Sequence, residues 1–287
     1  MVGAAAALWG TTGTAQSFAH ATLASTWIGA LRLVVAALFF VAWLALAERP
    51  ALARATLAAL PWPGIALAAV SMSVYNLAFF AGVRASGVAV GTAIALGSGP
   101  MWAGVLQAVA RGAAPARRWW AGTLLAVAGG ALMIVGRGAV GAWSAGGIGL
   151  CLVAGLSYAT YALVNKTLVA RAPAGVVTGA VFALAALIAL PIAFALAGPP
   201  ALGAADLAIV GWLGVMSTGI AYLLFSHALR HISGATGVAL ALAEPCVAFG
   251  LAVAIVGERP GWLAVAGLAG VLAGLGVVIR AELAGRR

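Results

Sequence analysis

A single acidic residue stands in the middle of a long apolar stretch in the C-terminal part of the chain. Residues 233–262 include an apolar run of about 22 residues, which as a helix is long enough to cross a bilayer. Glu244 followed by Pro245 lies at its centre. A charged side chain in hydrocarbon costs about 2.5–3.5 kcal/mol even on insertion-based scales, so it usually faces a cavity or a protein interior. The proline lacks a backbone donor and bends the helix. This combination is typical of a pathway through a membrane.

Glu244 has two kinds of role open to it. As a functional group it could take up a proton during a transport cycle, or bind the amino group of a substrate. As a structural group it could be hydrogen-bonded to neighbouring helices or paired with Arg32, which lies at a comparable depth in another apolar segment. The sequence leaves both interpretations open.

Aromatic residues recur with polar neighbours at helical spacing. Trp9 and Thr12, Tyr75 and Phe79, and Tyr158 and Tyr161 are each three or four residues apart, and therefore share one face of a helix. Tyr222 lies in a further apolar segment. Such faces suit a ligand with an apolar body and a polar end. The alternative is that these rings only anchor helices at the membrane interface.

The segment Gly97-Ser98-Gly99-Pro100 predicts a flexible break in another apolar stretch. Backbone groups exposed there could contact a substrate, although a kink without ligand contact explains the pattern equally well. The predicted hinge or gating residues are Gly97, Gly99, Pro100 and Pro245. The predicted substrate-binding residues are Trp9, Thr12, Tyr75, Phe79, Ser98, Tyr158, Tyr161, Tyr222 and Glu244.

Composition places these residues in a membrane protein. The chain is 65% hydrophobic and 7% charged, with a mean hydropathy of +1.16, so a soluble domain could not bury its apolar surface. We predict an all-α integral membrane protein surrounded by the lipid bilayer. Nucleic-acid binding is not expected despite a net charge of +10, because the basic residues fall between apolar segments. Cys151 and Cys246 are isolated, and neither a metal site nor a cofactor is expected.

Apolar windows separated by turns and charges predict ten transmembrane helices with short connections. They fall near residues 2–22, 26–47, 63–84, 88–110, 119–136, 145–165, 174–197, 207–229, 234–256 and 262–281. Gly267, Gly270 and Gly274 give the last span a small-residue face. We interpret this face as close packing inside the bundle rather than a dimer seam, which is compatible with a monomer.

The basic residues predict the orientation. If both termini are cytoplasmic, eleven Lys and Arg residues lie inside and three outside, with Arg32 within a span. The reverse orientation would invert this asymmetry, so we predict the cell (inner) membrane with cytoplasmic N- and C-termini. The inside set is Arg49, Arg54, Arg111, Arg117, Arg118, Lys166, Arg171, Arg230, Arg280, Arg286 and Arg287, and the outside set is Arg84, Arg137 and Arg259.

An internal repeat divides the chain into two halves. Pro100 and Pro115 are fifteen residues apart, and so are Pro245 and Pro260. The order Tyr75, Arg84, Pro100, Pro115, Trp120 recurs as Tyr222, Arg230, Pro245, Pro260, Trp262. We predict two five-helix repeats, residues 1–140 and 141–287. Because five is odd, the second copy is inverted, and a substrate site is expected near the midplane between the halves.

A set of short motifs recurs along the chain in a characteristic order. They are Leu8-Trp9-Gly10, Arg32, the Ser-Gly turns at 86–87 and 233–234, Pro100, Glu244-Pro245, Gly257-Glu258-Arg259, and the Gly-rich fifth and tenth spans. On these motifs the chain resembles the drug/metabolite transporter superfamily, in the branch built from two EamA-type halves. The resemblance covers essentially the whole chain. It implies a ten-helix exporter of amino acids or other small metabolites, and the aromatic amino-acid exporters are one candidate subgroup.

Two departures show that the halves are not equivalent. The loop after the fourth span reads Arg111-Gly112-Ala113-Ala114, where the family pattern often carries Gly-Glu-Arg. The first half also lacks an acidic residue before Pro100. A symmetric pair of acids is therefore not expected.

The leading functional interpretation is a secondary transporter that exports neutral or aromatic amino acids by alternating access, and not an enzyme. No GxxxxGK[ST] loop for ATP is present. A passive, channel-like facilitator is the first alternative, since nothing in the sequence reports coupling. An intramembrane serine hydrolase using Ser98 and His227 is the second. It lacks support, because Leu96 replaces the glycine of a GxSG turn.

Overall fold

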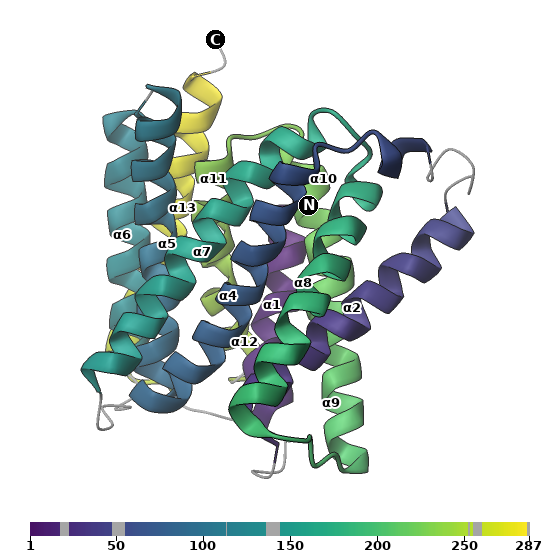
Figure 1. Cartoon of the computed structure of the whole chain (residues 1–287). Coiled ribbons are helices and arrows are strands. Elements are labelled where there is room, and N and C mark those ends of the chain that lie inside the picture. Colours follow the sequence, from purple (N-terminus) through teal and green to yellow (C-terminus); the bar gives the residue numbers. More distant parts are fainter. Residues whose placement is uncertain are drawn as a thin grey trace.

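The computed structural model describes residues 1–17, 23–47, 55–112, 114–135, 144–251, 253–254 and 260–285, and within them all regular structure is helical. The helices form one bundle (Figure 1). Their bounds are α1 Val2–Ser17, α2 Ser25–Ala47, α4 Trp62–Ser86, α5 Val88–Arg111, α6 Arg117–Val135, α7 Ala145–Val169, α8 Ala174–Ala197, α9 Ala204–Gly214, α10 Ala221–Leu229, α11 Gly234–Leu240, α12 Glu244–Leu251 and α13 Trp262–Ala284.

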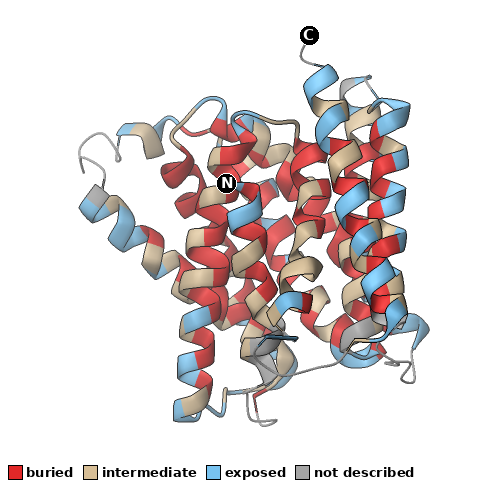
Figure 2. Ribbon diagram, turned by 180° about the vertical axis from the view of Figure 1, so that it is seen from behind, coloured by how far each residue is buried: buried red, intermediate tan, exposed pale blue. Residues whose placement is uncertain are grey.

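Most of these helices have the length and composition of membrane spans. Among the described residues, eight helical segments are long and apolar enough to cross a bilayer: α2, α4, α5, α7, α8, the continuous run α9–α10, the run α11–α12, and α13. Helix α1 packs on α12 and α10, and α6 packs on α13, so both belong to the same bundle. Buried residues concentrate in the interior of the bundle, while exposed ones lie on the outward faces and at the ends (Figure 2).

The predicted ends of the spans agree with the ends of the helices, but α1 and α6 are not among the eight candidate membrane spans of the described residues, so ten transmembrane helices stay a prediction. The span 174–197 coincides with α8, and other predicted ends that fall among the described residues lie within four residues of the observed ones. The far ends of the spans 2–22, 119–136 and 234–256 lie outside the described residues, as does the predicted boundary between residues 140 and 141. Arg49, Arg54, Arg137, Arg259, Arg286, Arg287 and the Gly257-Glu258-Arg259 motif also lie outside them.

Two spans are interrupted near their middle. Between α9 and α10 the chain forms a π-helical turn, Val215–Ile220. Between α11 and α12 it forms a 3₁₀ turn, Ala241–Ala243, in which the Glu244 N–H donates to the Ala241 carbonyl. Because Pro245 has no N–H, it could not donate to that carbonyl in an α-helix. The tighter turn satisfies the carbonyl one residue earlier.

The predicted break at Pro100 is not seen. Helix α5 runs without interruption from Val88 to Arg111 with Pro100 inside it. Proline is tolerated in membrane helices because neighbouring helices and small local adjustments compensate for the freed backbone groups. The hinge role of Gly97, Gly99 and Pro100 therefore stays a prediction, whereas Pro245 follows an observed interruption.

Glycines allow α6 and α13 to touch along their backbones. A Cβ added to Gly267 would lie 2.5 Å from the Met133 nitrogen and 2.6 Å from the Gly129 carbonyl oxygen. One added to Gly274 would lie 2.5 Å from the Ala126 nitrogen. The small-residue face of the last span is thus used inside the bundle, in the way that close helix packing in membranes requires.

A Gly267→Leu variant should consequently be strongly destabilised. The neighbours are backbone atoms, so the helices must separate, and overpacking of this kind costs about 1–3 kcal/mol. We expect a clear fall in the melting temperature of the detergent-purified protein. The matched control is Gly276→Leu in the same helix, where an added Cβ meets nothing within 4 Å. Equal melting temperatures for the two variants would contradict this packing.

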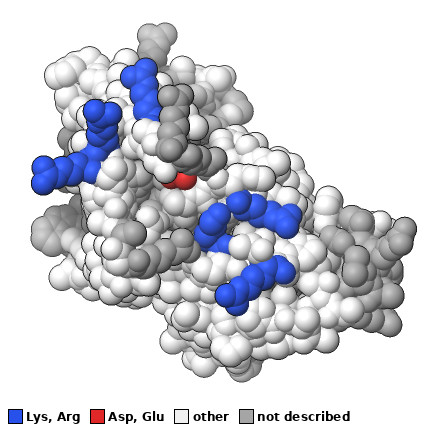
Figure 3. Space-filling model, turned by 90° about the horizontal axis from the view of Figure 1, so that it is seen from above, with Lys and Arg blue, Asp and Glu red and all other residues white. Residues whose placement is uncertain are grey.

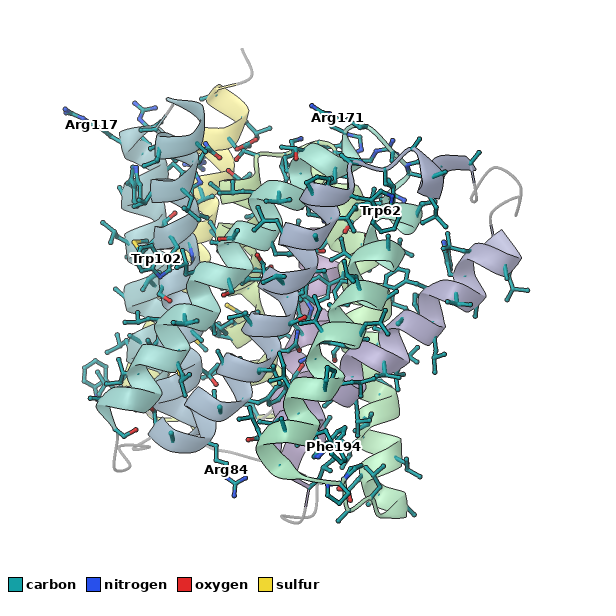
Figure 4. All side chains as sticks on the ribbon, in the orientation of Figure 1. Trp62, Arg84, Trp102, Arg117, Arg171 and Phe194 are labelled. Atoms are coloured by element: carbon teal, nitrogen blue, oxygen red, sulfur yellow. The ribbon has the colours of Figure 1, made fainter. Side chains whose placement is uncertain are left out.

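Basic side chains of the described residues lie at both ends of the bundle. Arg117 and Arg171 lie at the end from which the C-terminus leaves, and Arg84 lies at the opposite end (Figure 4). Figure 3, viewed onto the C-terminal end, shows Lys and Arg side chains spread over the surface around a small acidic patch.

Candidate functional site

A small cavity lies between the halves of the chain. Its volume is about 30 Å³, which leaves room for about two water molecules. An amino acid is larger, so in this conformation the cavity must widen before it can hold one. The described residues that line it are Trp9, Thr12, Arg32, Tyr75, Phe79, Leu96, Tyr158, Tyr222, Ala241 and Glu244.

Aromatic rings from four helices form its walls. The Trp9 ring centroid lies 5.2 Å from that of Tyr222 and 6.2 Å from that of Tyr158, both edge to face. Tyr75 lies 5.4 Å from Tyr158 and 5.7 Å from Phe79. Contacts of this geometry add about 0.5–1.5 kcal/mol per pair beyond area burial. The walls are therefore ordered, and they offer flat apolar surfaces to a ligand.

Two buried donors at this cavity have no hydrogen-bond partner among the residues that the structure describes. Trp9 is 6% and Tyr158 is 8% exposed. No hydrogen-bond partner is found among the described residues for the indole Nε1 of Trp9 or the hydroxyl of Tyr158. Buried polar groups are nearly always hydrogen-bonded, so each exception points to water, an ion or a ligand.

Glu244 also faces the cavity, with no hydrogen-bond partner for its carboxylate among the described residues. Among the described residues, no hydrogen bond or ion pair to its carboxylate is found. The other carboxylates among the described residues accept hydrogen bonds from the protein. Glu282 accepts from the Ser233 N–H at 3.0 Å and from the Ser233 hydroxyl at 3.1 Å. Asp206 accepts from the Gly203 N–H at 2.9 Å. The interpretation of Glu244 as a merely hydrogen-bonded residue thus finds no support in these contacts, whereas the Arg32 charge does attract the Glu244 carboxylate.

Arg32 is the cation of the site. Its side chain is 5% exposed, its Nε donates to the Thr218 hydroxyl at 2.9 Å, and its guanidinium carbon lies 5.7 Å from the Phe80 ring centroid. Thr218 belongs to the π-helical turn, and its hydroxyl donates in turn to the Leu213 carbonyl, five residues earlier, at 2.7 Å. The π turn therefore holds the threonine that orients Arg32.

The structure brings together seven of the nine residues predicted to bind substrate. Trp9, Thr12, Tyr75, Phe79, Tyr158, Tyr222 and Glu244 line the cavity, while Ser98 and Tyr161 are not among its lining residues. Sequence reasoning did not assign Arg32, Leu96 or Ala241 to the site. A charge left within an apolar span was the available signal for Arg32.

Tyr161 belongs to a separate buried network. The Asn165 side-chain amide donates to the Tyr161 hydroxyl at 3.2 Å and to the Ser226 hydroxyl at 2.9 Å. The Thr178 hydroxyl donates to Ser226 at 2.8 Å. All four side chains are fully buried. This network joins α7, α8 and α10, so Tyr161 has a structural role in this conformation.

Ser98 and its glycines lie at helix contacts. A Cβ added to Gly155 of α7 would lie 2.1 Å from the Ser98 Oγ. One added to Gly97 would lie 3.1 Å from Val127 of α6, and one added to Gly99 would lie 3.5 Å from Val238 of α11. These positions let α5 approach its neighbours closely.

We accordingly expect Ser98→Ala to retain transport within about two-fold, because it removes only a weak 3.4 Å hydrogen bond to the Ala95 carbonyl. Ser98→Leu should lower the melting temperature, because it forces α5 away from Gly155. Initial rates of uptake into proteoliposomes and thermal melting measure the two effects. A large loss of transport in Ser98→Ala with unchanged melting would return Ser98 to the substrate site.

The fold and the cavity define a polytopic membrane protein with a central site, and its family follows from comparison with known proteins. Residues 1–135 and, separately, residues 145–280 match the EamA-like transporter family. The chain belongs to this family, which confirms the resemblance seen in the sequence, and it is a small-molecule transporter of the membrane.

Two individual relatives extend this result. The chain is similar to the uncharacterized transporter YwfM of Bacillus subtilis (strain 168), with 33% identity over 267 residues that cover 91% of this chain and 88% of that protein. A solved crystal structure of another protein is similar in fold, with a TM-score of 0.82. The alignment covers 100% of this chain and 98% of the chain in that structure. At 21% identity this second likeness shows the fold alone.

Proposed function

We propose that this transporter exports neutral or aromatic amino acids by alternating access through the cavity around Glu244. The observation that carries the proposal is an acidic side chain without a protein partner among the described residues, enclosed by aromatic rings at the centre of the bundle. Glu244 would bind the ammonium group, and the rings would contact the apolar side chain of the substrate.

Helix pairing supports two inverted five-helix repeats, residues 1–140 and 141–287. If α1 corresponds to α7, then α4 and α5 correspond to α9–α10 and α11–α12. Helix α7 packs on α4 and α5, and α1 correspondingly packs on α10 and α12. Helix α2 packs on α8, and α6 packs on α13, as expected of elements that lie across a two-fold axis. Such repeats place a substrate site at their interface and permit a rocking motion around it.

The interrupted spans provide places for that motion. The π turn holds Thr218 beside Arg32, and the 3₁₀ turn ends at Glu244, so both irregular segments adjoin the cavity. Broken helices at the midplane are typical of transporters that open to each side in turn. The small volume of the cavity agrees with a conformation in which the site is too narrow for a substrate.

The charge distribution supports an orientation with both termini in the cytoplasm. The end that carries Arg117 and Arg171 (Figure 4) would face inward in the cell (inner) membrane, as the positive-inside rule requires. The bundle would work without a cofactor, with a small metabolite as its partner, and it would be functional as a monomer.

The alternatives make different use of the same residues. A passive facilitator would need the cavity to open at both ends at once. A serine hydrolase would need the Ser98 hydroxyl close to a general base such as His227. The Ser98 hydroxyl instead packs at the α5–α7 contact. The Nδ1 atom of His227 lies 2.8 Å from the Leu223 carbonyl oxygen in its own helix. These contacts disfavour the hydrolase, and flux measurements distinguish the carrier from the facilitator.

A counterflow assay with purified protein in liposomes tests the proposal. We expect labelled phenylalanine or leucine to exchange with saturation and competition by unlabelled amino acids. Flux that rises linearly with concentration would favour the facilitator. Exchange of sugar phosphates or polyamines but not amino acids would overturn the substrate class and leave the carrier intact.

A further inference from the structure

The cavity contains two opposite charges that attract each other across it without direct contact. Arg32 and Glu244 both line it, and among the described residues no ion pair joins them. The Nε of Arg32 donates a hydrogen bond to the Thr218 hydroxyl. No hydrogen bond from its two Nη groups to a described residue is found. A guanidinium placed in a membrane span is costly unless something compensates its charge. The planar fork of N–H donors on a guanidinium matches the two oxygens of a carboxylate.

The neighbours of Arg32 extend this donor set. The unpartnered Nε1 of Trp9 and hydroxyl of Tyr158 belong to the same lining. An indole N–H can only donate, and a tyrosine hydroxyl can donate. The cavity therefore combines a cation and two orphaned donors with a single described carboxylate, Glu244.

This arrangement discriminates by charge. An amine would meet Glu244 but would be repelled by Arg32, and a carboxylic acid or a phosphate would meet Arg32 but would be repelled by Glu244. A zwitterion with both groups on one carbon satisfies both charges. Rejection by a buried unpaired charge is a stronger source of specificity than the loss of an apolar contact.

We propose that Arg32 is a specificity-determining residue that binds the substrate carboxylate opposite Glu244, so that the site selects zwitterionic α-amino acids over amines and acids of the same shape. This inference rests on the proposed function. It adds the residue that binds the carboxylate of the substrate, while Glu244 binds the ammonium group. Thr218 is a positioning residue, because its hydroxyl fixes Arg32 from the π turn at 2.9 Å.

Three compounds of one shape test the proposal by direct binding to the purified protein: phenylalanine, its decarboxylated analogue phenethylamine, and its deaminated analogue 3-phenylpropionate. Isothermal titration should show binding of phenylalanine at least ten-fold tighter than binding of either analogue. Arg32→Gln should weaken phenylalanine at least ten-fold while it raises the affinity for phenethylamine. Arg32→Lys should restore part of the preference for phenylalanine.

The ratio of the affinities for phenylalanine and phenethylamine distinguishes a role of Arg32 in substrate recognition from a role in folding. A merely structural Arg32 would weaken both ligands together, and that result overturns the proposal. Thr218→Val should shift the ratio in the same direction with little change in melting temperature, and Thr218→Ser should leave it unaltered.

The two proposals fail in different ways. If the natural protein binds phenethylamine as tightly as phenylalanine, the role of Arg32 is wrong while amino-acid transport stands. If neither phenylalanine nor leucine binds or exchanges, the amino-acid function fails, and the role of Arg32 fails with it.

Discussion

A Glu244→Gln variant is expected to insert and fold normally and to exchange amino acids at least about ten-fold more slowly than the natural protein. A hydrogen bond to a charged group contributes about 1.5–3 kcal/mol, and 1.4 kcal/mol corresponds to a factor of ten. No described residue hydrogen-bonds to the carboxylate, so the amide loses only the electrostatic attraction to Arg32. Initial rates of counterflow and thermal melting should therefore respond differently, with a large loss of rate and little change in stability.

Glu244→Asp is the matched control, because it keeps the charge and shortens the side chain by one methylene. We expect it to retain more transport than Glu244→Gln. If Glu244→Gln transported at the natural rate, the carboxylate would have no part in binding the substrate.

A Trp9→Ala variant is expected to lose at least about ten-fold in substrate affinity and to melt at a lower temperature. Trp9 contacts Tyr158, Tyr222 and Phe225 with centroid distances of 6.2, 5.2 and 5.5 Å. Removal of a buried aromatic side chain costs about 3–5 kcal/mol in a packed core. The aromatic wall of the cavity should therefore collapse, and titration with phenylalanine measures the result.

Two control variants distinguish the contribution of the aromatic cavity wall from that of the Trp9 indole N–H and from the general effect of removing a tryptophan. Trp9→Phe keeps an aromatic face without the unpartnered N–H, and should recover most of the stability and part of the affinity. Trp262→Ala removes a tryptophan that is 75% exposed at the start of α13, and should leave binding unchanged. Equal losses in Trp9→Ala and Trp262→Ala would contradict the assignment of the cavity.

The sequence predicts the spans because hydropathy reports what contacts lipid. The predicted span 174–197 and helix α8 have the same ends, since Pro173 and Gly198 flank a predominantly apolar run. Interruptions within spans are harder to predict. The π turn at residues 215–220 shifts hydrogen bonds by one residue without altering the hydropathy, whereas the missing N–H of Pro245 marks the 3₁₀ turn directly.

The sequence predicts which helical face carries the cavity residues, but not how far along the helix the cavity extends. Tyr158 and Tyr161 share a helical face three residues apart, as the spacing predicts, yet only Tyr158 lines the cavity. Tyr161 lies one turn further along α7, where Asn165 and Ser226 engage it. Arg32 was visible as a charge within a span, but its hydrogen bond to Thr218 joins residues 186 positions apart. Such a contact depends on the fold.

Accessibility of Thr12, a lining residue on α1, tests the central claim most directly. A Thr12→Cys variant, with Cys151 and Cys246 replaced by alanine, would be exposed in oriented membrane vesicles to a membrane-impermeant maleimide from one side at a time. A substrate site that opens to each side in turn predicts labelling from either side, slowed by saturating phenylalanine. Labelling from neither side, or labelling that phenylalanine leaves unchanged, would contradict it.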